Sequence, residues 1–119
     1  MKLERDTELT MLETVVLPKI QQAKECLRAG KTEEMWKIIS HDLIGLFQPY
    51  RDSEMKKYNN APDNLKESPN VERMLNNAEA YQKAIDLLWD GKENAPRSVD
   101  EETLSAVENI VKGIIGKRR

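Results

Sequence analysis

The chain has 119 residues, a formal net charge of −2, and a charged fraction of 34 % beside a hydrophobic fraction of 39 %. This length suits one domain with its own core, and the slight acidic excess argues against a protein built mainly to hold nucleic acid. The single cysteine, Cys26, excludes an internal disulfide and a cysteine-based zinc site. Residues 1–6 carry charges where a signal peptide needs an apolar run, and no apolar stretch approaches the length of a membrane span. We therefore expect a cytoplasmic protein without a membrane segment.

The spacing of apolar residues predicts four helices, over about 7–29, 33–48, 69–90 and 99–115. In the first of them, Gly30 is suited to end the helix. Pro18 interrupts the pattern, so we expect either a kink there or a helix that begins only near Val16 or Leu17. The apolar stripe of this helix consists of Leu9, Leu12, Val16, Ile20, Ala23 and Leu27.

The second predicted helix opens at Thr32, whose side chain is suited to an N-cap. Pro49 should stop or bend this helix, with a short extra helix after it as the alternative to a loop. Its main apolar stripe consists of Trp36, Ile39, Leu43, Leu46, Phe47 and Tyr50.

Residues 59–70 contain two prolines and four asparagines, which predicts the longest connection of the chain, flexible over 59–68. Ser68 followed by Pro69 suits the start of the third helix, and Gly91 suits its end. Ser98 and Glu101 have the spacing of a capping box for the last helix. Amphipathic helices joined in this way favour antiparallel neighbours, so the sequence predicts an all-α, up-down four-helix bundle.

No catalytic, metal or cofactor site can be recognised in the sequence. His41 and Asp42 are adjacent on a helix and project in different directions, so the carboxylate would not orient the imidazole for acid–base chemistry. Cys26 lies at the margin of an apolar stripe and has no neighbouring base in the sequence, which suits a half-buried hydrophobe better than a nucleophile. With one histidine, the chain cannot supply the paired ligands of a di-metal bundle.

The second helix also carries residues that depart from its main apolar stripe. Gly45 is costly inside a helix, and close approach of another backbone is one reason to keep it. Two interpretations remain open: this helix is central and touches two neighbours, or the second face binds another chain, which is either a foreign protein or a second copy. The candidate partner-binding residues are Ile38, His41, Ile44, Gly45 and Gln48.

These observations favour a non-catalytic protein-binding module, such as an inhibitor, an immunity or antagonist protein, or an adaptor that acts on a larger cytoplasmic partner. One alternative is an accessory factor that binds nucleic acid through a basic C-terminus, although we consider nucleic acid an unlikely partner. The residues for that alternative are Lys112, Lys117, Arg118 and Arg119.

A second alternative is a small-ligand pocket between the helices. Its lining would be the aromatic side chains of Trp36, Tyr81 and Trp89. We favour a core position for all three, because no convergent set of polar residues accompanies them.

Overall fold

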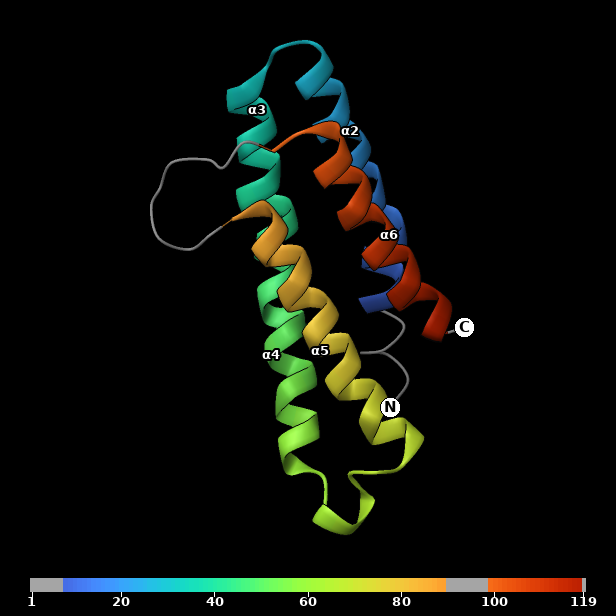
Figure 1. Ribbon diagram of the computed structural model, residues 1–119. Coiled ribbons are helices and arrows are strands. Elements are labelled where there is room, and N and C mark those ends of the chain that lie inside the picture. The colour runs from blue at the N-terminus through green and yellow to red at the C-terminus, as the bar shows by residue number, and fades with distance from the viewer. Residues whose placement is uncertain (1–7, 90–98, 119) are drawn as a thin grey trace.

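The computed structural model describes residues 8–89 and 99–118, and these residues form helices and short connections without a strand. The helices run up, down, up and down beside one another, as Figure 1 shows. The prediction of an all-α, antiparallel four-helix bundle is therefore confirmed. Within the described ranges, no helix is long and apolar enough to cross a membrane.

The first helix is already helical at Glu8 and continues through a π-helical turn, η1 (Leu12–Val16), into α2 (Leu17–Arg28). Of the two alternatives for Pro18, a start near Val16 or Leu17 is wrong, because the chain is helical from Glu8 onward. In η1 the amide of Leu17 donates to the carbonyl oxygen of Leu12, one residue farther back than in an α-helix. This wider turn ends two residues before Pro18, which cannot donate a backbone hydrogen bond.

The second helix consists of α3 (Thr32–Lys37), the π-helical turn η2 (Ile38–Leu43) and α4 (Ile44–Asn60). The predicted end at residue 48 is wrong, because Pro49 lies inside α4. A proline inside a helix costs about 3 kcal/mol, but buried side chains on both sides of it, Phe47 and Glu54, anchor α4 to the neighbouring helix. Tertiary packing therefore outweighs the local preference of the proline.

The connection after α4 covers residues 61–68 and contains a 3₁₀ turn, η3 (Asp63–Leu65), before α5 (Pro69–Leu88) begins. The predicted start of this loop at residue 59 is wrong, because α4 continues through Asn60. Ser68 occupies the N-cap of α5, as predicted, but its side chain makes no capping hydrogen bond. The last helix, α6 (Glu101–Arg118), begins two residues later than predicted. Its cap is Asp100, whose carboxylate accepts hydrogen bonds of 2.8 Å from the backbone and the hydroxyl of Thr103.

Two sequence predictions lie outside the described residues: Gly91 as the end of the third helix, and the role of Ser98 in a capping box. α5 ends at Leu88, where Trp89 takes an extended backbone. α3 begins at Thr32 itself, so the N-cap position belongs to Lys31 and the predicted threonine cap is wrong.

The bundle is elongated, with extents of 51 × 29 × 20 Å. α2 and α6 cover one part of its length, while α4 and α5 extend beyond them as a two-helix hairpin (Figure 1). The turn between α2 and α3 and the connection between α4 and α5 therefore lie at opposite ends. Inside the bundle, the largest fully buried hydrophobic side chains include Leu12, Ile20, Ile39, Leu43, Phe47, Tyr81, Leu88, Leu104 and Ile114.

Candidate functional site

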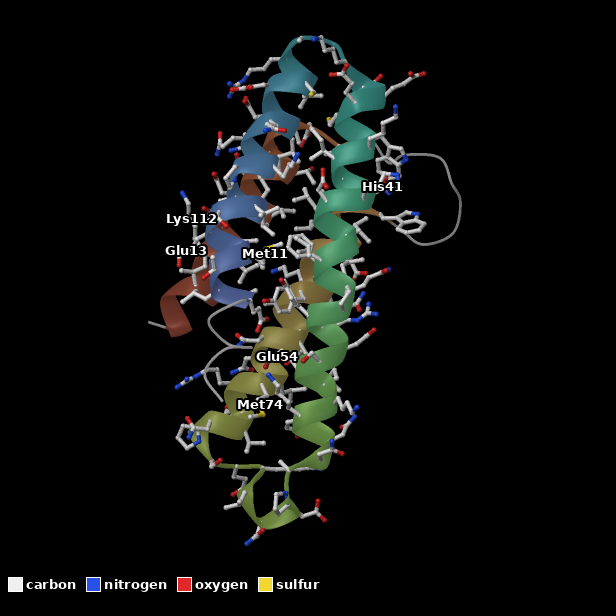
Figure 2. All side chains as sticks on the ribbon, turned by 180° about the vertical axis from the view of Figure 1, so that it is seen from behind. Met11, Glu13, His41, Glu54, Met74 and Lys112 are labelled. Carbon is white, nitrogen blue, oxygen red and sulfur yellow. The ribbon has the colours of Figure 1, made fainter. Side chains whose placement is uncertain are left out.

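The predicted second face of the second helix does not form one continuous surface. Ile44 is only 2 % exposed and belongs to the core, so its assignment to a contact surface is wrong. The cause is η2: a π turn holds an extra residue and rotates the following side chains, so that both Leu43 and Ile44 face inward. His41, which points away from the bundle in Figure 2, is exposed.

Gly45 is exposed, and a Cβ atom built on it would meet only the carbonyl oxygen of Ser40, at an ordinary 3.9 Å. No other backbone in the described residues approaches this glycine, so close helix contact is not its reason in this chain. Gly45 instead lies four residues before Pro49, and the ring of a proline inside a helix crowds the carbonyl group of the residue four positions earlier. A glycine allows this carbonyl to tilt most easily.

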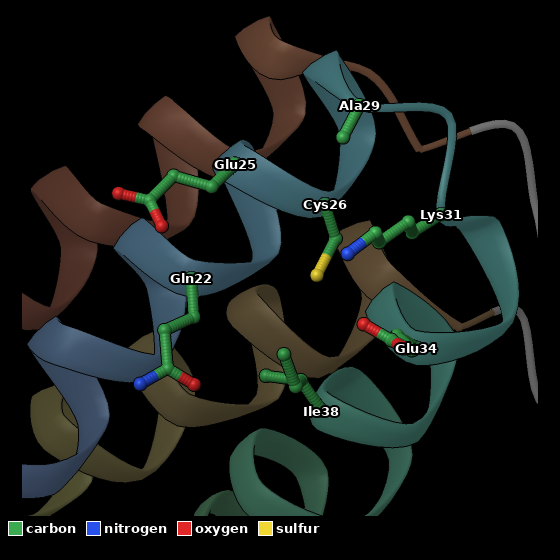
Figure 3. Close-up of a pocket in the computed structure, with 7 residues that line it drawn as sticks. All are labelled: Gln22, Glu25, Cys26, Ala29, Lys31, Glu34 and Ile38. Carbon is green, nitrogen blue, oxygen red and sulfur yellow. The ribbon is translucent and has the colours of Figure 1, made fainter.

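Ile38, another residue of that predicted face, is half-buried and lines a groove between α2 and α3. The thiol of Cys26 points into this groove from α2, as Figure 3 shows. The groove has a volume of about 280 Å³ and is open to solvent on one side. Its lining residues are Gln22, Glu25, Cys26, Ala29, Lys31, Glu34 and Ile38.

A tight helix ending fixes the two sides of the groove relative to each other. Gly30 has a φ of 75°, the left-handed conformation that favours glycine. The amide of Lys31 donates to the carbonyl oxygen of Cys26 at 2.8 Å, and the amide of Gly30 donates to that of Leu27 at 3.2 Å. These two bonds make a Schellman motif, which ends α2 and lets α3 begin directly beside it.

The rim of the groove is charged, while its floor is apolar. Glu25 on one side and Lys31 and Glu34 on the other are exposed. Within the described part of the chain, none of these three side chains belongs to an ion pair. Cys26 and Ile38 provide the apolar floor, and both pack against the hydrophobic core. An apolar centre within a polar rim is typical of a surface that receives a side chain of another protein.

The size of the groove distinguishes between classes of ligand. Pockets for drug-sized molecules have volumes of about 300–1,000 Å³ and enclose most of the ligand. This groove, at about 280 Å³, lies at the lower limit of that range, and it is open. Because it does not enclose a ligand, it suits an inserted side chain better than a cofactor.

The arrangement of titratable groups offers no acid–base pair at His41. The carboxylate of Asp42 turns toward α2, where it lies 3.6 Å from the ammonium of Lys19. In the described ranges, no set of histidine, cysteine, aspartate and glutamate side chains could hold a metal ion.

The residues of the two alternative functions are not brought together as a site. Lys112 is exposed on α6, and the side chains of Lys117, Arg118 and Arg119 lie outside what the structure describes. Tyr81 is fully buried between Phe47 and Tyr50, with ring centroids 6.0 and 5.8 Å away, so it is a core residue. Trp36 and Trp89 are partly buried and pack against the same core.

Sequence reasoning missed a layer of buried polar side chains where the four-helix part gives way to the hairpin. Glu8 is 7 % exposed and accepts a hydrogen bond of 2.6 Å from the hydroxyl of Tyr81. Burial, and then the charge of Glu8, raise the pKa of Tyr50. Glu54, which lies between α4 and α5 in Figure 2, and Asn77 are also buried. The burial of Glu54 could have been predicted, since positions 47, 50 and 54 are separated by steps of three and four residues and so lie on one face of a helix.

No protein-family model, curated protein or solved structure matches the chain. The groove and the helices that form it therefore provide the only basis for assigning a function.

Proposed function

We propose that this chain is a non-catalytic protein-binding module that receives an apolar side chain of its partner in the groove between α2 and α3. In this proposal the chain is an inhibitor, antagonist or adaptor of a larger protein. The single observation that carries it is the groove itself: an apolar floor of Cys26 and Ile38 inside a charged rim, with a volume suited to a side chain.

A cytoplasmic location belongs to the same proposal. Its support is the free thiol of Cys26, which faces the groove. Unpaired cysteines are ordinary in reducing compartments, and an exposed partner site containing one is best preserved there.

The test fills the groove without removing a core residue. Ala29 is exposed and lines the groove, so Ala29→Phe places a ring in the space that the partner would use. Ser53→Phe is the matched control, because it adds the same ring at an exposed position of α4 that does not line the groove. Circular dichroism checks that both variants retain the helical content of the wild type.

Each protein is immobilised and exposed to a cell extract, and retained proteins are identified by mass spectrometry. We expect a protein that the wild type and Ser53→Phe retain and that Ala29→Phe loses. The recovered protein should then slow alkylation of Cys26 by N-ethylmaleimide. Retention that does not differ between the two variants would overturn the assignment of the groove.

A further inference from the structure

The part of the α4–α5 hairpin that extends beyond α2 and α6 has buried side chains of its own. Figure 2 shows Glu54 and Met74 in this extension, below the described start of the first helix. Val71 is 8 % exposed and Ala78 is 2 % exposed, but neither belongs to the hydrophobic core cluster of the bundle. In the described residues, the extension is therefore packed as a two-helix unit, α4 against α5.

A layer of buried polar side chains separates this unit from the core. The rings of Tyr50 and Tyr81 pack together across α4 and α5, with centroids 5.8 Å apart. Four residues farther toward the hairpin turn on each helix lie Glu54, which is 3 % exposed, and Asn77, which is 2 % exposed. Because α4 and α5 are antiparallel, the same number of residues leads to the same level on both helices. This level contributes less apolar burial than the core beside it.

Asn77 weakens the contact between the two helices at this level. Its side-chain carbonyl oxygen is buried, and no donor in the described residues forms a hydrogen bond to it. In the packed form this oxygen has lost its hydrogen bonds to water without a replacement, which is unfavourable. Separation of α4 and α5 at this point restores the hydrogen bonds to water and removes that cost.

The backbone of α4 is interrupted at the same boundary. Pro49 lies between Phe47, which is fully buried in the core, and Glu54. The nitrogen of Pro49 carries no hydrogen, so the helical hydrogen bond to the carbonyl oxygen of Gly45 is missing. Helix formation propagates along the chain through such bonds. α4 can therefore unfold on one side of Pro49 and stay helical on the other.

We propose that residues 54–77, called the hairpin end, unfold and refold as one unit while the four-helix part stays folded. Helices as short as these are unstable in water on their own, so they unfold when they part. Unfolding exposes apolar side chains that the packed form keeps at least half-buried: Met55, Tyr58, Val71, Met74 and Leu75. A ligand that binds these side chains stabilises the open form. This inference is independent of the proposed function, because the groove lies at the other end of the bundle.

Native-state hydrogen exchange tests the proposal, followed by NMR on the isotope-labelled full chain at low urea concentrations. Amides of the hairpin end, at Lys57 and Asn76, are compared with core amides at Ala23 and Val107. We expect protection factors at least about tenfold lower in the hairpin end. The dependence on urea should be smaller there, because unfolding of the hairpin end exposes less surface than global unfolding. Both helices of the hairpin end should share one urea dependence.

Two results of this experiment would overturn the proposal. If the hairpin end and the core have equal protection factors and the same urea dependence, the chain unfolds only as a whole. If protection falls gradually toward the hairpin turn and does not depend on urea, the helix ends fray and no cooperative unit exists.

Asn77→Leu tests the role of the polar layer. It replaces the buried, unpaired oxygen by an apolar side chain of similar size, so exchange in the hairpin end should slow by about tenfold. Asn76→Leu is the matched control, because it makes the same substitution at the adjacent exposed position and should leave exchange unchanged. Equal exchange rates in the two variants would show that this layer does not limit the stability of the hairpin end, and the proposed boundary would be wrong.

Ile20→Val tests whether the four-helix part is independent of the hairpin end. Ile20 is fully buried in the core, and loss of one methyl group should speed exchange of the core amides by about threefold to tenfold. The hairpin end should exchange as in the wild type, because its local unfolding leaves this core intact. An equal increase in both parts would contradict the proposal.

Discussion

Gly30 provides the sharpest test of the geometry that forms the groove. Its φ of 75° is a conformation that costs an L-residue about 1–2 kcal/mol. An added Cβ would meet nothing within 4 Å, so no clash contributes to the effect of Gly30→Ala. The alanine also restricts the unfolded chain, which offsets about 0.4–1 kcal/mol. The free energy of unfolding should therefore fall by about 1 kcal/mol, measured by urea denaturation with an unchanged m-value.

Gly113 is the matched control for this prediction. It lies inside α6, an added Cβ there also meets nothing within 4 Å, and its φ is not positive. Gly113→Ala should therefore raise the free energy of unfolding by about 0.5–1 kcal/mol. Opposite signs for the two substitutions are the expected result. If Gly30→Ala stabilises the protein as Gly113→Ala does, the left-handed turn and the groove derived from it are incorrect.

Three further predictions concern the polar contacts. Tyr81→Phe removes a buried hydrogen bond to the Glu8 carboxylate and should lower the free energy of unfolding by about 1.5–3 kcal/mol in urea denaturation. Hydrogen bonds from Thr103 lower the pKa of Asp100, so this cap stabilises the fold above pH 3.8 and loses its effect as the pH falls below that value. The melting temperature of Asp100→Ala should accordingly lie below that of the wild type at pH 7 and approach it in acid. The pKa of Tyr50 is raised above 10.0, mainly by burial, so stability should fall as the pH rises past 10, and Tyr50→Phe should lose less in alkaline denaturation.

The helical architecture was predictable because local signals and core spacing agree over most of the chain. Pro69 at the start of α5 and the inward residues of α5 and α6 point to the same elements. Pro49 is the exception. Its local preference predicted the end of a helix, whereas Phe47 and Glu54 on either side of it are buried against the rest of the bundle. Whether packing outweighs such a preference depends on the neighbouring helix, which a local pattern does not contain.

Part of the groove could be predicted from the sequence, because both of its floor residues depart from the apolar stripes. Cys26 lies at the margin of the first stripe, and Ile38 lies off the second. Two physical effects determine which residues join them. The π turn over 38–43 turns Ile44 into the core and leaves Ile38 at the surface of the groove, although the sequence prediction grouped both in one contact surface. The left-handed Gly30 then sets the short turn that brings α2 and α3 together. Gly30 could be recognised in the sequence as a helix end. The π turn carries no recognised sequence signal, so the prediction placed Ile38 in a contact surface with Ile44 instead of in the groove with Cys26.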